Sequence, residues 1–78
     1  MIATPLINQV EMIVREQTGM PARDVRLLPT DAGIVLFITI LVSATESFAR
    51  AHQIASELEE ALRQQMPEIA DVVVHTAP

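Results

Sequence analysis

The amino-acid sequence predicts an α+β domain in which two helices pack on one face of a three-stranded mixed sheet, in the order helix, strand, strand, helix, strand. Apolar residues recur at helical spacing in two stretches, and runs rich in valine and isoleucine indicate strands. A strand, helix, strand crossover of this length is right-handed, which leaves the second and third strands parallel. With 78 residues, the chain fits one domain spanning residues 1–78.

The first helix is predicted between Thr4 and Gly19. Thr4 supplies a capping side chain, Pro5 suits the first helical position, and Gly19 suits the left-handed residue that ends a helix. Four apolar residues fall on one face of this helix: Leu6, Val10, Ile13 and Val14.

A hairpin of two strands follows the first helix. The first strand is predicted from Asp24 to Leu28, residues 29–33 form the reversing turn, and the second strand runs from Ile34 to Val42. Side chains alternate along a strand, so the second strand divides into two faces. One face carries Ile34, Leu36, Ile38, Ile40 and Val42, and the other carries Val35, Phe37, Thr39 and Leu41.

Both faces of the second strand are therefore apolar, although two helices cover only one side of the sheet. A two-fold contact with a second copy, made by Phe37, Thr39 and Leu41, is the simplest cover for the other side. If each subunit buries an extra ~300 Å² there, the pair gains on the order of 15 kcal/mol before the costs of association. The alternative is that a loop or the amino terminus covers this face.

The second helix is predicted to run to about Gln65, where Pro67 ends it. Ser43 and Glu46 have the spacing of a capping box, with Thr45 as the competing cap. The predicted buried stripe consists of Phe48, Ala51, Ala55, Leu58 and Leu62, and the predicted solvent face includes Glu57, Glu60 and Arg63.

The third strand is predicted from Ile69 to Thr76. Alternation places His75 near its carboxyl end, on the same face as Asp71 and Val73. The residues of the opposite face are Val72, Val74 and Thr76. The pattern leaves open which of the two faces meets the helices, because both are mixed.

Composition excludes several classes of protein. A formal net charge of -5 with scattered arginines argues against nucleic-acid binding. The absence of cysteine excludes disulfides and thiolate metal sites. The longest uncharged run, Ala32 to Thr45, is shorter than the roughly 20 residues that a membrane helix needs, and no basic segment marks a signal peptide. No catalytic dyad is evident, so the sequence predicts a protein that is not an enzyme.

The carboxyl-terminal half carries a recognisable pattern. Ala51 and His52 lie in the second helix, a Leu-Glu-Glu stretch follows at residues 58–60, and the strand from Ala70 to His75 leads to a closing Pro78. This pattern resembles the cytoplasmic C-terminal domain of cation diffusion facilitator transporters, and the resemblance extends more weakly back to Gly19. It implies a ferredoxin-like or metallochaperone-like fold and a V-shaped homodimer, located in the cytoplasm, that regulates ion transport.

The resemblance also implies a partner and leaves the state of the chain open. The chain is expected to be either an excised transporter domain or a free-standing homologue that associates with a full-length cation transporter. An initiating Met1 that leads directly into a helix favours the free-standing version.

Two histidines are the metal ligands that the resemblance implies, with zinc as the expected ion. His75 matches the position that commonly binds metal at the dimer interface, and His52 matches a peripheral ligand. Other positions depart from the pattern: Ala77 and Thr39 stand where relatives have ligands, and the cationic Arg23 replaces a histidine.

Simpler interpretations remain open. His52 fits a helix-edge residue and His75 a half-exposed strand end. The domain as a whole also fits a dimerisation domain that needs no metal, or a ferredoxin-like regulatory module that binds a small molecule at a strand edge between subunits.

Overall fold

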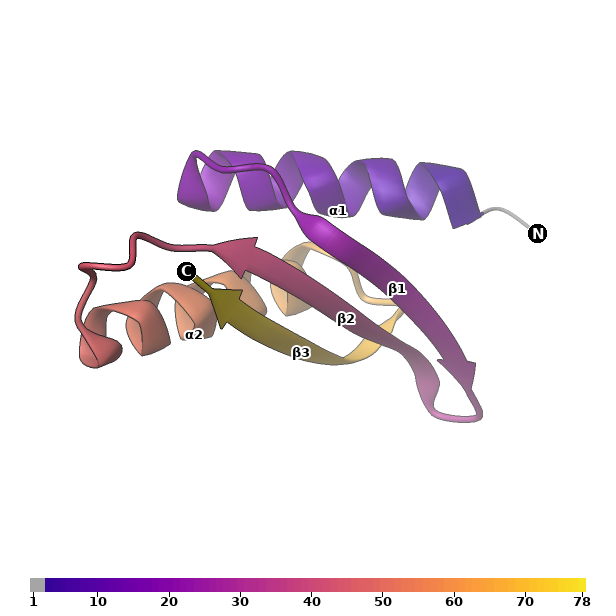
Figure 1. Ribbon diagram of the computed structural model, residues 1–78. Coiled ribbons are helices and arrows are strands. Elements are labelled where there is room, and N and C mark those ends of the chain that lie inside the picture. The colour runs from indigo at the N-terminus through magenta and orange to yellow at the C-terminus, as the bar shows by residue number, and fades with distance from the viewer. Residues whose placement is uncertain (1–2) are drawn as a thin grey trace.

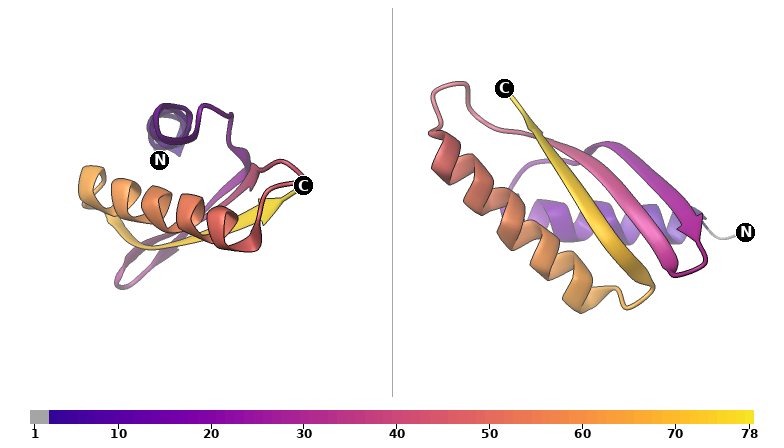
Figure 2. Two further views of the ribbon diagram at one scale, coloured as in Figure 1. Left: turned by 90° about the vertical axis from the view of Figure 1, so that its left-hand side faces the viewer. Right: turned by 90° about the horizontal axis from the view of Figure 1, so that it is seen from below.

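Two helices and three strands make up the chain, for which a computed structural model describes residues 3–78, with side chains described from Pro5 onward. The elements are α1 (Ala3–Thr18), β1 (Arg23–Thr30), β2 (Gly33–Leu41), α2 (Phe48–Gln65) and β3 (Ile69–Ala77). The sheet has the order β1-β2-β3, with β1 antiparallel and β3 parallel to β2. Both helices lie on the same side of the strands (Figures 1 and 2). The predicted fold class and the parallel crossover are confirmed.

Helix α1 ends where the sequence predicts. Gly19 takes a φ of 73°, and its N–H donates to the carbonyl of Arg15 at 2.8 Å, so the left-handed glycine closes the last turn. The helix begins at Ala3, one residue before the predicted cap Thr4. Thr4 therefore lies within the first turn, and its side chain lies outside the described part of the structure.

The β1–β2 hairpin is tighter than the sequence predicts. Residues Pro29 and Thr30 were expected in the turn, but they extend β1 and pair with Ile34 and Gly33. Proline is tolerated there because β1 is an edge strand, where a missing N–H costs no ladder bond. The turn shrinks to residues 31–32. The Thr30 hydroxyl accepts from the Ala32 N–H at 3.2 Å and donates to the Gly33 carbonyl at 2.6 Å.

Glycine is required at position 33 for two reasons: the backbone has a positive φ, and a side chain would meet the start of β3. The φ of Gly33 is 126°, and a Cβ at this position would lie 3.1 Å from the Cβ of Ala70 and 3.2 Å from the carbonyl oxygen of Glu68. We expect Gly33→Ala to lower the free energy of unfolding by about 1–3 kcal/mol, because the strained φ adds to the contact with backbone. Urea denaturation measures the loss. Gly19→Ala is the matched control, since a Cβ there meets nothing within 4 Å. Equal losses would contradict the role of the contact.

The start of α2 differs from the prediction. The N-cap is Ser47, whose hydroxyl accepts from the Arg50 N–H at 3.0 Å, and neither Ser43 nor Thr45 caps the helix. Their hydroxyls are hydrogen-bonded to each other at 2.8 Å in the preceding loop. The proposed box with Glu46 is therefore wrong, because Ser47 offers an equally suitable hydroxyl adjacent to the first helical residue.

Phe48 was predicted in the buried stripe of α2, but its side chain is 85% exposed. The first turn of α2 lies beyond the strand ends, so no sheet lies beneath it (Figure 1). The other members of the predicted stripe are partly or fully buried, and Leu58 and Leu62 are completely enclosed. The predicted solvent face is exposed, and Arg63 and Glu60 form an ion pair at 3.6 Å.

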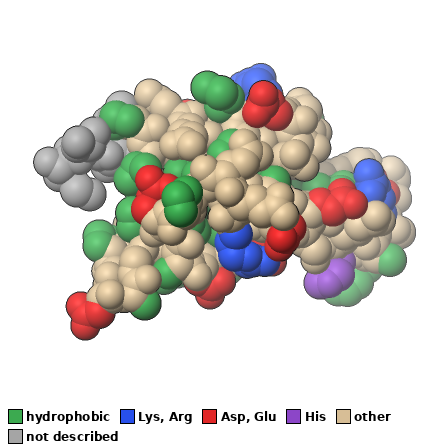
Figure 3. Space-filling view, turned by 180° about the vertical axis from the view of Figure 1, so that it is seen from behind, with side chains coloured by type: hydrophobic (Ala, Val, Ile, Leu, Met, Phe, Trp, Pro, Cys, Tyr) green, Lys and Arg blue, Asp and Glu red, His purple; other side chains and the backbone are tan. Residues whose placement is uncertain are grey.

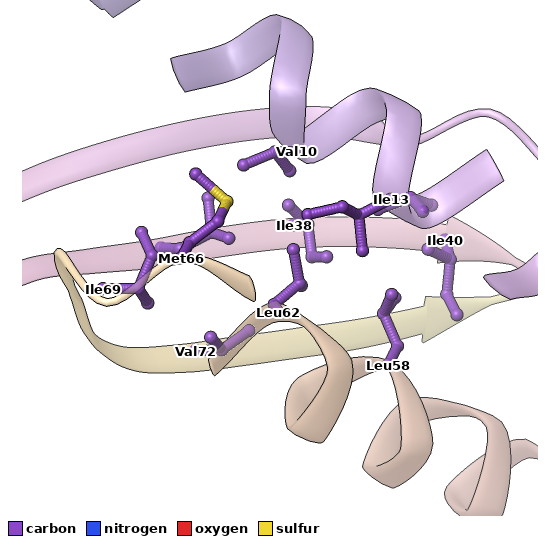
Figure 4. Packing of buried hydrophobic residues seen from close by; sticks show 11 residues of the cluster. Val10, Ile13, Ile38, Ile40, Leu58, Leu62, Met66, Ile69 and Val72 are labelled. Atoms are coloured by element: carbon purple, nitrogen blue, oxygen red, sulfur yellow. The ribbon is translucent and has the colours of Figure 1, made fainter. Parts of the chain in front are cut away.

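One hydrophobic core lies between the helices and the sheet (Figure 4). Side chains of α1 and α2 meet the Leu36, Ile38 and Ile40 face of β2. The full cluster is Val10, Ile13, Val14, Leu36, Ile38, Ile40, Leu58, Leu62, Met66, Ile69 and Val72. Because Val72 belongs to it, the Val72 face of β3 points to the helices. Asp71, Val73 and His75 therefore point to the opposite side of the sheet.

Candidate dimer face and metal-ligating residues

The side of the sheet away from the helices has no covering element in residues 3–78, and we call it the open face. Cross-strand pairing sets its side chains in rows, such as Arg26, Phe37 and Val73, or Leu28, Val35 and Asp71. The face comprises Arg23, Arg26, Leu28, Val35, Phe37, Thr39, Leu41, Asp71, Val73, His75 and Ala77. Leu28 is 51% exposed and Val73 is 45% exposed, so large apolar side chains face solvent in the isolated chain.

Phe37 lies at the centre of the open face. The Arg26 guanidinium carbon lies 5.9 Å from the centroid of its ring, within range of a cation–π contact. A shallow hollow of about 280 Å³ is lined by Arg26, Leu27, Leu28 and Phe37. Thr39 and Leu41 are half-buried on the same face. The structure thus places all three predicted contact residues of β2 side by side on one accessible surface.

His75 occupies an exposed position on the open face, paired with Thr39 of β2. Thr39 is paired on its other side with Arg23 of β1. Two strand spacings separate the backbones of Arg23 and His75 by about 10 Å. The guanidinium therefore belongs to the same row as the imidazole, where it adds a positive charge that disfavours a nearby metal cation.

His52 lies elsewhere. It is exposed on α2, which lies behind the sheet, whereas His75 points away from the helices. The structure therefore does not bring the two histidines together. Among the described side chains, no three histidine, aspartate or glutamate residues gather closely enough to hold a metal ion. A single copy of the described chain supplies an incomplete ligand set.

A second hollow was not predicted from the sequence. It has a volume of about 480 Å³ and lies where β2 ends, beside the end of α1 and the first turns of α2. Its lining is mostly apolar, with polar groups from Thr18, Ser43 and Glu46. Because four separate segments contribute to it, no local sequence pattern could have indicated it.

Among the described residues, the helix side of the molecule carries charges of both signs. Acidic and basic side chains are interspersed with hydrophobic ones there (Figure 3). In residues 3–78, no helix is long and apolar enough to cross a membrane.

Comparison with known proteins identifies relatives. Residues 6–78 match the family ZT_dimer, described as "Cation efflux protein, cytoplasmic domain". No curated protein sequence matches the chain significantly. Several solved structures, in contrast, share its fold over nearly its whole length.

One of these structures is the Zn form of CzrB, a candidate zinc transporter, with a TM-score of 0.89 and 19% identity, covering 99% of this chain and 89% of that chain. A second is the metal-bound C-terminal domain of the CzcD transporter from Thermotoga maritima, with a TM-score of 0.85 and 18% identity, covering 100% and 93%. A third is MamM-CTD, with a TM-score of 0.87 and 16% identity, covering 96% of each chain. At these identities the likeness establishes a shared fold.

Proposed function

Because the chain belongs to the family of cation efflux protein cytoplasmic domains, we propose that it is a non-enzymatic, homodimeric regulatory domain that senses a divalent metal ion, zinc foremost. Metal binding at the dimer sets the angle between the two subunits. That angle is the signal passed to a cation transport domain, whether the transport domain is attached to this chain or associates with it.

The proposed dimer rests on the exposed apolar side chains of the open face. These side chains have no partner within the described chain, and an apolar surface of this kind on a small domain marks an interaction site. A second copy provides the matching apolar surface through a two-fold contact. The central strand of the sheet is β2, and it carries Phe37, Thr39 and Leu41. These three residues therefore lie in the middle of the open face, where we place the centre of the dimer contact.

The metal proposal rests on His75. Its imidazole is exposed on the open face, beside the proposed contact, and imidazole suits zinc and related transition metals. Since one described chain gathers no three ligands, a second subunit or water has to supply the rest. Two similar folds were solved with metal, one of them in a Zn form, which supports zinc as the first ion to test.

Calorimetric titration with zinc tests the assignment. We expect His75→Ala to weaken zinc binding at least ~10-fold, because it removes a principal ligand. His52→Ala is the matched control, since this second histidine is also exposed but lies on α2, and it should change the affinity much less. The reverse order would move the site to α2 and reject the assignment to His75.

A dimerisation domain that needs no metal is the second candidate, and Arg23 in the row of His75 is the observation that favours it. Melting with and without zinc separates the two. A ligand that binds only the native state raises the melting temperature, and the rise grows with the logarithm of the ligand concentration above the dissociation constant. An unchanged melting temperature at millimolar zinc would select the metal-independent candidate.

A further inference from the structure

The two edges of the sheet are protected to different degrees. Edge strand β1 carries a bulge at Asp24, whose φ is 51°, together with Pro29 and the charged Arg23 and Arg26. Bulges, prolines and charges are the devices that prevent an edge strand from pairing with another chain. The other edge strand, β3, has a register shift only at its start, beside Ala70, and from Asp71 to Ala77 it pairs regularly with β2, without proline and with three consecutive valines. Seen from below, no other element crosses in front of β3 (Figure 2, right).

Hydrogen bonds define which groups this outer edge presents. The Ala77 carbonyl accepts from the Val42 N–H at 2.8 Å and so points toward β2. Because the backbone groups of successive residues in the regularly paired part of β3 point to opposite edges, the N–H and C=O groups of Val72, Val74 and Thr76 point outward. The Val72 N–H agrees with this, since it donates to the side chain of its own neighbour, Asp71 Oδ1, at 2.9 Å.

The sequence of β3 is complementary to itself in one antiparallel register. If two copies pair with Val73 opposite Val73, then Asp71 of each strand lies opposite His75 of the other, and Val72 lies opposite Val74. The outward backbone groups then meet as hydrogen-bonded pairs. Asp71, Val73 and His75 occupy the alternate positions, where side chains approach most closely. In this register, the imidazole N–H of each His75 would donate to the Asp71 carboxylate of the other copy, on each side of the central valine pair.

We infer that the outer edge of β3 is a second self-association surface, which pairs antiparallel with β3 of another copy in the register centred on Val73. The contact is distinct from the Phe37 contact proposed for the open face and does not depend on it. Because backbone hydrogen bonds replace bonds to water, we expect a dissociation constant on the order of 100 µM or weaker. Two different two-fold surfaces on one chain would join dimers into larger assemblies at high local concentration.

Disulfide trapping tests the register, because the chain contains no cysteine of its own. One sample of the chain carries Asp71→Cys and the other carries His75→Cys. One of them is extended by a tag, so that mixed dimers differ in mass from homodimers. The two are mixed at high concentration with a chelator, which removes metal ions, and are then oxidised. All chains also carry Phe37→Glu, so the result does not depend on the proposed open-face dimer. Directly opposite Cα atoms at such positions lie about 4.5 Å apart, within the range of a disulfide. We expect the mixed dimer in several-fold excess over either homodimer.

The same register separates Asp71 of one copy from Asp71 of the other by about 13 Å, too far for a disulfide. Leu28→Cys on β1 is the control for random collision, since it is exposed on the protected edge strand. A statistical mixture of dimers, no dimers, or equal trapping of Leu28→Cys would each overturn the proposal. Both substituted residues are exposed, and circular dichroism confirms folding before oxidation.

A charge exchange provides a second measurement without cysteine. In the Phe37→Glu background, Asp71→Arg removes the carboxylate that would accept from His75 of the other copy and sets a donor opposite a donor, so it should reduce self-association in concentrated samples, measured by sedimentation. Adding His75→Glu restores an opposite pair and should restore association. If the double variant self-associates no more than the Asp71→Arg variant, the proposed register is wrong.

Discussion

Replacing Phe37 by glutamate should convert the protein at low micromolar concentration from a dimer to a folded monomer. In the monomer, the new carboxylate would stand beside Arg26, which now lies 5.9 Å from the Phe37 ring, so the isolated chain tolerates it. In the proposed dimer, the same charge would be buried without a partner, at a cost of about 3–5 kcal/mol. A loss of that size weakens association by roughly 100- to 5,000-fold. Sedimentation equilibrium measures the change in mass.

The chain provides its own control, because its second and last phenylalanine is Phe48. Phe48 is 85% exposed on the first turn of α2 and does not belong to the open face. Phe48→Glu should therefore leave the dimer intact. A folded Phe37→Glu protein that keeps the dimer mass would reject the open face as the interface, and a monomer produced by Phe48→Glu alone would move the interface to α2.

Periodicity accounts for what could be predicted of the fold. The helical spacing of Val10, Ile13 and Val14 and the two-residue alternation of β2 depend on short-range geometry that the backbone imposes directly. The handedness of crossovers then determined the parallel pairing of β3. These features needed no knowledge of side-chain contacts.

The details that failed depend on competition between near neighbours. Three nearby residues offer a hydroxyl: Ser43, Thr45 and Ser47. Because α2 begins directly after Ser47, only the Ser47 hydroxyl can accept from the first turn. This start places Phe48 on the first turn of α2, where its side chain has no strand to pack against, although its spacing matches the predicted buried stripe. A local sequence pattern can indicate where a helix ends along the chain, but it does not show how far that helix extends past the strands in space.

The candidate site also combines features that short-range geometry predicts with features that depend on how separate elements pack. Alternation placed Phe37, Thr39 and Leu41 on one side of β2, but it left open which face of β3 points to the helices. That choice depends on Val72 packing against the core, and it is what exposes His75 on the open face. Whether ligands from two copies complete a metal site depends on a second chain, which the sequence of one chain does not describe.

Replacing Leu62 by alanine should have the largest effect on stability. Leu62 is fully enclosed at the middle of the core, between β2, β3 and α1 (Figure 4). Deleting a buried leucine side chain costs about 2–5 kcal/mol, through lost burial and the cavity left behind. A domain of this size has a total stability of roughly 4–12 kcal/mol, so much of it would be lost. The melting temperature should fall by about 10–30 °C.

Met12 supplies the comparison, because it has a side chain of similar volume on α1 but is 62% exposed. Met12→Ala should change the free energy of unfolding by no more than about 0.5 kcal/mol, as is usual for surface positions. Both variants need to be compared at one protein concentration, since dimerisation adds concentration-dependent stability to the native state. If Leu62→Ala proves as mild as Met12→Ala, the core is not packed around α2 as described.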